Sequence, residues 1–215
     1  MNALNISVAP GAEPPVVSSD VAFTPTVKAL QARRGSRATY ARMEQNGGWR
    51  TTVTADLAAF LAQADSFYLA TANAAGQPYI QHRGGPPGFL RVLDERTLAF
   101  ADFKGNRQYI TAGNLADNAQ AFIFVMDYAN RRRIKLWGRA RVVDGDDALV
   151  GELFPPGYDA RPEQAIVFTI TAWDSNCPQH IPRKVPAEAA AAAIAQYATR
   201  IEELEAEVAR LKAAR

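Results

Sequence analysis

Residues 67–101 read FYLATANAAGQPYIQHRGGPPGFLRVLDERTLAFA, and this stretch decides the fold. It holds short apolar runs at 67–71, 78–82, 89–93 and 97–101. Asn, Gly, Pro and Asp residues separate the runs, and each run has the length of a β-strand rather than of a helix. We therefore predict that consecutive antiparallel strands begin at about residue 66.

More strands are predicted beyond this stretch. A helix over residues 106–115 interrupts the series, and further strands follow at 121–126, 132–143 and 165–173. Six or seven strands with one helical crossover suit a closed barrel, because closure removes exposed strand edges. The chain is thus predicted to be mainly β with additional helices.

The residues outside the barrel form three segments. Residues 1–20 are rich in Pro, Ala, Gly and Ser without an apolar period, so we predict a mobile leader. Residues 21–64 contain short helices that we expect to pack on the barrel domain, residues 65–185. Their predicted bounds are 27–33, 36–44 and 55–64, the last with Thr54 as N-cap and with Leu57, Phe60 and Leu61 on one face.

The last segment, residues 186–215, is predicted to be a helix that pairs as a coiled coil. Its apolar residues recur at alternating steps of three and four, at Ile194, Tyr197, Ile201, Leu204, Val208 and Leu211. This is an a/d seam of about three heptads. In a parallel pair Arg200 would face Glu205 of the partner, and Glu207 would face Lys212. The alternative is an amphipathic helix that lies on its own barrel.

The composition excludes several classes of protein. The 215 residues suit one barrel domain with helical extensions. With 24 Lys and Arg against 22 Asp and Glu, the net charge of +2 is too small for a nucleic-acid binder. No apolar run reaches the ~18 residues of a membrane span, and Cys177 alone can form no intrachain disulfide. We expect a soluble protein of the reducing cytoplasm without a secretory signal.

Cationic side chains gather at the ends and on the faces of the predicted strands. Arg91 follows one apolar run, Lys104 and Arg107 flank a Gly-Asn turn that opens the predicted helix, and Arg133 and Lys135 alternate along one strand. A phosphate dianion needs charge-assisted donors in fixed positions, to which the free N–H groups of a helix start would add. The pattern predicts a site for a phosphate monoester attached to an electron-rich ring.

The order of these features resembles the FMN-binding split β-barrel of the pyridoxamine 5'-phosphate oxidase-like superfamily. The likeness covers about residues 65–183, and the segments 83–88 and 177–182 are similar to those of a bacterial oxidase-like subgroup. The resemblance implies an α+β protein that is mainly β, a six- to seven-stranded antiparallel split β-barrel. To this the chain adds N-terminal helices and the long C-terminal helix. Family members are homodimers that bind FMN between their subunits, so FMN and a second copy are the expected partners.

The resemblance also implies which residues bind FMN. Arg107 would keep the phosphate cation of the family, Asn106 would replace a hydroxyl donor, and Gln108 stands where the family has a lysine. Lys104 or Arg83 would then supply the missing charge. The implied cofactor-binding set is Arg83, Gly88, Phe89, Leu90, Arg91, Ala101, Asp102, Lys104, Asn106, Arg107, Arg133, Lys135, Trp173 and Arg183.

Four residues of this set correspond to particular positions of the family. Arg133 stands where the family has a glutamine that meets the flavin, and Lys135 lies two residues on, on the same strand face. A cation there would stabilise the reduced, anionic ring. Trp173 and Arg183 match a family tryptophan and an FMN-contacting arginine at the same separation.

The substrate region departs from the family. True pyridoxamine 5'-phosphate oxidases hold their substrate with an Arg-x-His pair, but here the two positions are Gln179 and Ile181, with His180 one residue out of register. The family's substrate-phosphate ligands are not reproduced at 152–158. We therefore expect an FMN-dependent oxidoreductase with another substrate, or an electron donor such as NAD(P)H. The predicted substrate pocket is His82, Cys177, Gln179 and His180, and no catalytic residue is assigned.

Other interpretations remain open. The protein could be a non-catalytic flavin-binding protein, or a split barrel that uses a deazaflavin or haem. Arg131, Arg132 and Arg133 could be a solvated turn, Lys104 and Arg107 could be surface charges, and His82 could be a hydrogen-bonded barrel histidine. Cys177 lacks an identifiable base for a nucleophilic role. The sequence offers no cluster of His or carboxylate residues that would predict a metal site.

Overall fold

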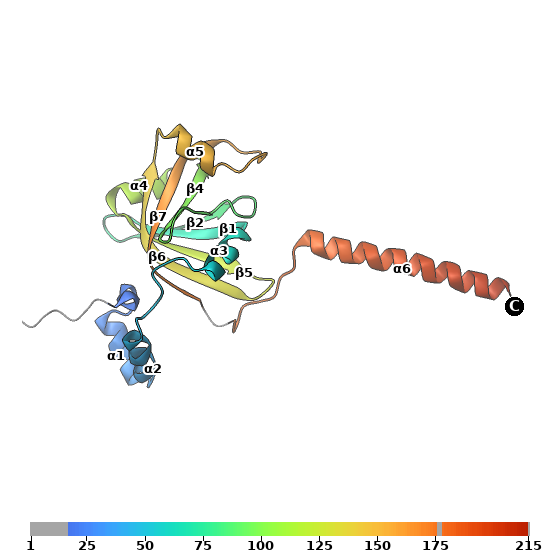
Figure 1. Cartoon of the computed structure of the whole chain (residues 1–215), viewed down its shortest axis with the longest axis horizontal. Helices are drawn as coiled ribbons and strands as arrows, with labels where there is room; N and C mark the ends of the chain where they lie inside the picture. The colour runs from blue at the N-terminus through green and yellow to red at the C-terminus, as the bar shows by residue number, and fades with distance from the viewer. Residues whose placement is uncertain (1–16, 176–177, 215) are drawn as a thin grey trace, which may run out of the picture.

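A seven-stranded antiparallel sheet in the order β2-β1-β5-β6-β7-β4-β3 forms the centre of the molecule (Figure 1). The structure is a computed structural model that describes residues 17–175 and 178–214. The predicted α+β split barrel with a long C-terminal helix is confirmed. The strands are β1 (Ser66–Ala72), β2 (Pro78–Gly84), β3 (Arg91–Val92), β4 (Thr97–Phe103), β5 (Gln120–Asp127), β6 (Arg132–Val143) and β7 (Pro162–Ser175).

The barrel core follows from the alternation of side chains along the strands. In β1, β5 and β6 every second residue is buried, and Leu69, Ile123 and Leu136 are completely buried. One end of the core is covered by α3 (Ala55–Ala62), whose face of Leu57, Phe60 and Leu61 packs into it as predicted. The hydroxyl of Thr54 accepts a hydrogen bond from the N–H of Leu57 at 3.3 Å and so starts this helix.

The longest ladder of the sheet joins β6 to β7, and it contains one irregularity. The register shifts between Trp137 and Gly138, where β7 approaches β6 very closely. A Cβ atom at Gly138 would lie 2.2 Å from the carbonyl oxygen of Thr169 and 2.6 Å from the ring of Phe168. Only glycine fits there, because such a distance is far inside van der Waals contact.

A second, smaller core lies on the outer side of β4 and β7. Leu98 and Phe100 of β4 face the barrel core, while Ala99 and Ala101 face α5 (Asp147–Leu153). The buried Leu153 anchors α5 on these alanines, and Asp146 caps the helix by accepting a hydrogen bond from the N–H of Leu149 at 2.9 Å. The smallness of the alanine side chains lets the helix approach the sheet closely.

Two strand predictions need correction. The predicted closed barrel is instead an open strand order whose edges are β2 and β3. The predicted strand at 89–93 is shortened to β3, because Phe89 and Leu90 turn into the core, where they are 3% and 2% exposed. Gly88 has φ +81° and makes this turn possible.

The N-terminal helices lie beside the barrel. They are the 3-10 helix η1 (Ser18–Val21), α1 (Pro25–Arg33) and α2 (Arg37–Gln45). The fully buried Ser19 places the end of the predicted mobile leader in ordered structure, and residues 1–16 lie outside the described residues. Aromatic contacts attach this segment, since Trp49 stacks on Trp137 of β6 with ring centroids 4.5 Å apart.

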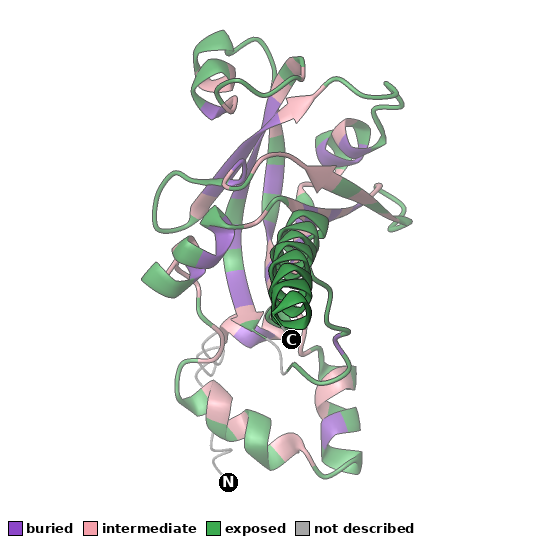
Figure 2. Cartoon of the chain, turned by 90° about the vertical axis from the view of Figure 1, so that its right-hand side faces the viewer, coloured by how far each residue is buried: buried purple, intermediate pink, exposed green. Residues whose placement is uncertain are grey.

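The last two helices differ in their surroundings. The short α4 (Ile110–Asp117) packs on the sheet, where the buried Asn114 amide donates a hydrogen bond to the Thr71 hydroxyl at 3.0 Å. The long α6 (Ala187–Ala213) projects away from the barrel, and Figure 2 shows it exposed on all sides. None of the helices in the described parts of the chain has the length and apolar character that a bilayer crossing requires.

Candidate functional site

A small pocket of about 50 Å³ lies where β2, the end of β4, the loop before α4 and the start of β7 meet. We call it the cradle. Four of the predicted FMN-binding residues line it, namely Arg83, Asp102, Asn106 and Arg107. They come from three separate stretches of sequence, so the fold brings them together. The other polar residues of its lining are Tyr79, Gln81, Gln108, Tyr109, Thr111, Glu163 and Gln164.

The loop of the cradle is not the helix start that the sequence predicts. The helix begins only at Ile110, and Arg107 and Tyr109 have φ of +61° and +54°. The Asn106 side chain accepts a hydrogen bond from the N–H of Gln108 at 3.2 Å, which stabilises a turn in place of helix. The cradle is therefore built by a turn, and the predicted contribution of a helix start at Asn106 does not apply.

The inner half of the cradle is an ion pair that joins β2 to β4. The guanidinium of Arg83 pairs with the carboxylate of Asp102, and both side chains are nearly buried, at 11% and 12% exposed. Gln164 donates a second hydrogen bond to Asp102 at 2.9 Å, and Arg83 also lies over the ring of Phe100. The Nε of Arg83 is buried and has no hydrogen-bond partner among residues 17–175 and 178–214. One N–H donor is thus left over beside the pocket.

The outer half of the cradle is an exposed chain of hydrogen bonds. The Nε of Arg107 donates to the Tyr109 hydroxyl at 3.4 Å, and that hydroxyl donates to the carboxylate of Glu163 at 2.8 Å. The hydrogen bond to Tyr109 and then the negative charge of Glu163 raise the pKa of the Arg107 guanidinium. Each of the two cradle cations, Arg83 and Arg107, is thus near a carboxylate of the same chain.

The predicted ring-binding residues lie on the outer face of the sheet. Arg133, Lys135 and Trp137 alternate along β6 on the face opposite the core, beside Phe122 and Phe124 of β5. The Nε of Arg133 is buried and, within the described residues, lacks a hydrogen-bond partner. This face also carries Ile80 of β2, which is 60% exposed. The outer face therefore combines aromatic, aliphatic and cationic side chains.

Lys135 and Trp173 also line a larger pocket, of about 750 Å³, between the N-terminal helices and strands β6 and β7. The Lys135 ammonium lies 2.9 Å from Asp174 and within 5.4 Å of the ring centroids of Trp49 and Trp137. The Trp173 ring is 4% exposed, and its Nε1 donates to the carbonyl oxygen of Thr52 at 2.8 Å. Part of the predicted ring site is therefore already covered by residues of the same chain.

The remaining predicted cofactor residues lie outside the cradle. Phe89, Leu90 and Ala101 are core residues, and Gly88 donates its N–H to the carbonyl oxygen of Ala64 at 3.2 Å. Arg91 is exposed on the edge strand β3. Lys104 is exposed, and its N–H donates to the carbonyl oxygen of Arg161 at 2.8 Å. Of the two residues expected to supply the missing phosphate charge, only Arg83 lines the pocket.

The predicted substrate residues are not brought together. His82 is exposed on the outer face, with its ring 5.6 Å from that of Tyr68. Gln179 and His180 lie in an exposed turn, and His180 has φ +63°. Cys177 lies outside the described residues. Arg183 donates to the carbonyl oxygen of Ala129 at 3.3 Å and so lies against the turn between β5 and β6.

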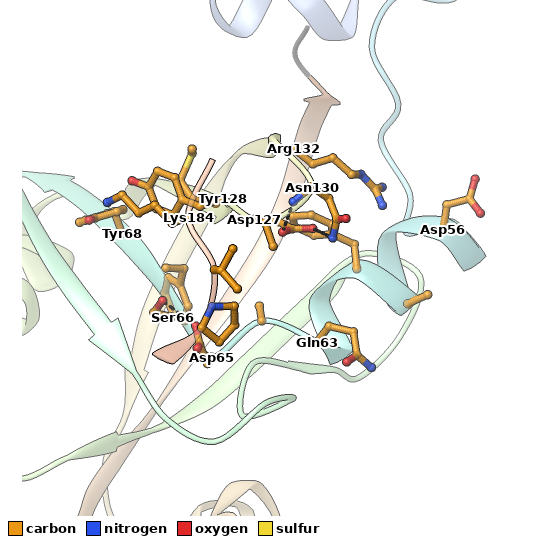
Figure 3. Close-up of a pocket in the computed structure, with 18 residues that line it drawn as sticks. Asp56, Gln63, Asp65, Ser66, Tyr68, Asp127, Tyr128, Asn130, Arg132 and Lys184 are labelled. Carbon is orange, nitrogen blue, oxygen red and sulfur yellow. Dashed lines mark hydrogen bonds between the residues drawn. The ribbon is translucent and has the colours of Figure 1, made fainter. Parts of the chain in front are cut away.

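A further pocket of about 670 Å³ opens beside that turn (Figure 3). It lies between α3, the start of β1 and the segment that leads into α6. Its cations rest on aromatic rings, with Lys184 4.2 Å from the centroid of Tyr128 and Arg132 5.0 Å from that of Phe60. None of the predicted site residues lines it. Arg132 is exposed and lies over this ring of the core.

Sequence reasoning missed several cradle residues. Gln81 could have been found, because it alternates with Arg83 on β2 and so shares its face. The side-chain amide oxygen of Gln81 accepts a hydrogen bond from the Thr111 hydroxyl at 2.8 Å. Glu163 had no local signal, since it meets Tyr109 from 54 positions away in the sequence. No three His, Cys, Asp or Glu side chains in the described ranges cluster as metal ligands would.

Comparison with known proteins gives one family. The sequence model of the pyridoxamine 5'-phosphate oxidase family matches residues 53–177. None of the curated proteins compared with the chain matches it. Among solved structures, HupZ of Group A Streptococcus is 17% identical over 62% of this chain and 99% of that chain, with a TM-score of 0.48.

Two other solved structures are similar in the same region. A putative pyridoxamine 5'-phosphate oxidase from Lactobacillus delbrueckii is 18% identical over 58% of this chain and 95% of that chain, with a TM-score of 0.45. HutZ, the haem storage protein from Vibrio cholerae, is 15% identical over 54% and 87%, with a TM-score of 0.37.

Proposed function

The chain belongs to the pyridoxamine 5'-phosphate oxidase family, and from this premise we propose that it is a homodimeric, FMN-dependent oxidoreductase. We further propose that its substrate is not pyridoxamine 5'-phosphate. One observation carries the proposal: Arg83, Asn106 and Arg107, expected from separate stretches to hold a cofactor phosphate, line one pocket together with Asp102 of the implied cofactor-binding set.

The polar atoms of the cradle and the outer face fit such a cofactor. Arg83 has a buried Nε with no partner in the described residues, beside the cradle, and Arg133 has one on the outer face. A buried N–H donor without an acceptor is costly, so a bound group that accepts from it would remove that cost. The phosphate end would lie at Arg83 and Arg107, whereas Arg133 and Lys135, on the opposite face of the sheet, would meet the ring only of a cofactor shared between two subunits.

The carboxylates of the cradle orient its two cations and would compete with a phosphate for them. Asp102 holds Arg83, and Glu163 holds Arg107 through Tyr109, so both cations are oriented before any ligand arrives. A phosphate would have to share these cations with the carboxylates. We therefore infer that FMN affinity is moderate and that it depends on the charges of Asp102 and Glu163.

The outer face would support the ring and the partner subunit. Bound FMN would supply transfer of hydride or of single electrons. The cations Arg133 and Lys135 would stabilise negative charge on a reduced ring. Ile80 and the half-buried Phe122 and Phe124 offer an apolar surface that a second subunit would cover, and family members are commonly dimeric.

Burial of Ile181 favours a second candidate function, a flavin-binding protein without turnover. Ile181 is 6% exposed and stands at one of the two positions that hold the substrate in true oxidases. The other, Gln179, lies in an exposed turn. Reduction of the flavin-loaded protein by NAD(P)H, followed by its absorption spectrum, would support the enzyme, whereas a spectrum that stays oxidised would support the binding protein.

A titration with FMN and riboflavin tests the phosphate assignment. The protein should bind FMN more tightly than riboflavin, and Arg107→Ala should weaken FMN several-fold while leaving riboflavin unchanged. Lys104→Ala is the matched control, because Lys104 is a neighbouring cation that does not line the cradle. Equal affinities for the two flavins would contradict the proposal. A haem or deazaflavin spectrum in the purified protein would show that the protein uses that cofactor and not FMN.

The substrate assignment has its own test. Oxygen uptake should stay at background when the FMN-loaded protein is given pyridoxamine 5'-phosphate, because Gln179 and Ile181 replace the residues that would hold it. Turnover at an ordinary enzyme rate, about 1–1,000 per second, would show that other residues perform this role.

A further inference from the structure

The last helix leaves its whole apolar stripe in water. Every residue from 182 to 214 is exposed, and α6 points away from the barrel (Figure 1) and is coloured as exposed along its length (Figure 2). The stripe retains between 47% and 71% of its side-chain exposure at Ile194, Tyr197, Ile201, Leu204, Val208 and Leu211. Single exposed apolar residues are normal on protein surfaces, but a continuous row along one helix face indicates a binding surface.

The stripe has the form of a coiled-coil seam. The branched Ile194, Ile201 and Val208 occupy the a positions, and Leu204 and Leu211 occupy d positions with Tyr197. β-Branched residues at a with leucine at d favour two parallel strands. The 27 residues of α6 are long enough to form a coiled coil with a partner helix. Such packing would stabilise α6, because an isolated helix gains little stability from its own hydrogen bonds.

The spacing of the side chains on α6 leaves room for one side chain of such a partner. An apolar groove of about 390 Å³ lies on the helix, and Ile201, Leu204, Glu205 and Val208 line most of it. These are an a, the following d and e, and the next a residue. In a parallel pair the same four positions surround the d side chain of the other helix, here Leu204 of a second copy.

The charges beside the seam identify the partner as another copy of this chain. In a parallel, in-register pair Arg200 at g faces Glu205 at e of the other helix, and Glu207 faces Lys212. All four charges are then matched, and the twofold symmetry repeats both pairs. An antiparallel pair with full overlap would still match Arg200 with Glu207, but it would place Glu205 opposite Ala198 and Lys212 opposite Ala191.

We propose that α6 forms a parallel two-stranded coiled coil with α6 of a second copy. Within one chain Arg200 already pairs with Glu203 at 2.7 Å, and Arg210 pairs with Glu207. These exposed pairs are weak and can exchange for contacts between helices. The proposal does not depend on the cofactor, because no residue of α6 lines the cradle.

Disulfide crosslinking of the full-length chain tests the pairing and its direction. With Cys177 replaced by Ser, Leu211→Cys should give a covalent dimer under mild oxidation, because parallel helices bring the two copies of position 211 together. Thr199→Cys is the matched control, since position f faces away from the seam, and it should give little crosslink. An equimolar mixture of Ile194→Cys and Leu211→Cys chains should form few mixed dimers.

The possible outcomes separate the alternatives. Mixed dimers without dimers of Leu211→Cys alone would mean antiparallel helices and would overturn the proposal. Equal crosslinking at 199 and 211 would indicate random collision, and no crosslink at either would mean that the helices do not pair. Glu205→Arg should reduce the yield at 211 several-fold, and adding Arg200→Glu should restore it, because the second change re-creates the matched pair.

Discussion

The barrel strands and α6 are both apolar along one face, but only the barrel strands bury that face within their own chain. In the barrel, Leu136 of β6 is completely buried by strands and a helix from distant parts of the sequence. In α6, Leu204 belongs to an equally regular pattern but keeps 47% of its exposure. Regular patterning therefore predicts an element, and the neighbours that the fold supplies decide whether the element is stabilised within its own chain.

The same substitution in both regions should give the largest contrast. Leu136→Ala should lower the free energy of unfolding by about 2–5 kcal/mol, because it removes transfer energy and leaves a cavity. Leu204→Ala should change the unfolding of the barrel by less than about 0.5 kcal/mol, because Leu204 lies on α6, outside the barrel core. Urea denaturation followed by tryptophan fluorescence measures both, since the tryptophans lie at the barrel.

Equal losses of unfolding free energy for Leu136→Ala and Leu204→Ala would contradict the difference between the two regions. They would mean that α6 folds back on the barrel of its own chain in solution, or that the barrel unfolds together with a paired α6. Repeating the Leu204→Ala measurement at several protein concentrations separates these cases, because only a contact between chains depends on concentration.

Substitution of two glycines should change stability in opposite directions, because one lies in close packing between strands and the other on an open helix surface. Gly138→Ala should cost about 1–3 kcal/mol or more, because its Cβ would meet a backbone oxygen that cannot move without breaking the β6–β7 ladder. Gly113→Ala on α4 has nothing within 4 Å of its Cβ, so it should stabilise the protein by about 0.5–1 kcal/mol. Thermal unfolding of the two variants would show opposite shifts, and a shift of the same sign would contradict the close approach at Gly138.

The sequence predicted best where one periodic pattern extends over many residues. The bounds of β6 agree with the prediction, residue for residue, because buried side chains alternate with less buried ones from Arg133 to Arg141. The C-terminal helix is likewise continuous from the predicted start, since its residues are strong helix formers. In both elements local preference and pattern point to the same structure.

Prediction failed where the backbone conformation depends on single, atypical residues. The left-handed conformations of Arg107 and Tyr109 have no glycine to indicate them, so the sequence predicts the start of a helix where the cradle loop lies. The apolar run predicts Phe89 and Leu90 in a strand, whereas the loop before them turns them into the core. The pairing of Arg83 with Asp102 could not be derived either, because it depends on how β2 meets β4.

Ion pairs repeat the contrast between the two regions on a smaller scale. Asp102→Asn should lower the free energy of unfolding by about 1–3 kcal/mol, because the nearly buried guanidinium of Arg83 would lose its charged partner. Glu203→Gln removes an exposed partner of Arg200 on α6 and should cost at most about 0.5 kcal/mol. Urea unfolding at low and at high salt measures both, and a Glu203→Gln effect as large as that of Asp102→Asn would show that exposure does not govern these pairs.

The smallest effect concerns Asp94, in the turn between β3 and β4. Its carboxylate accepts a hydrogen bond from the N–H of Arg96 at 2.7 Å, and this bond, followed by that from the Thr97 hydroxyl, lowers the pKa of Asp94 below its ordinary value of 3.8. A lowered pKa in the folded state contributes stability above the unfolded pKa, and this contribution is lost as the pH falls through the folded pKa. Asp94→Asn should therefore be slightly less stable than the unmodified protein at neutral pH. Urea unfolding between pH 6 and 2 should show this difference shrinking below 3.8. Leu204→Ala removes no ionisable group, so its difference should stay constant over the same range, and a constant difference for Asp94→Asn would contradict the role of its charge in the turn.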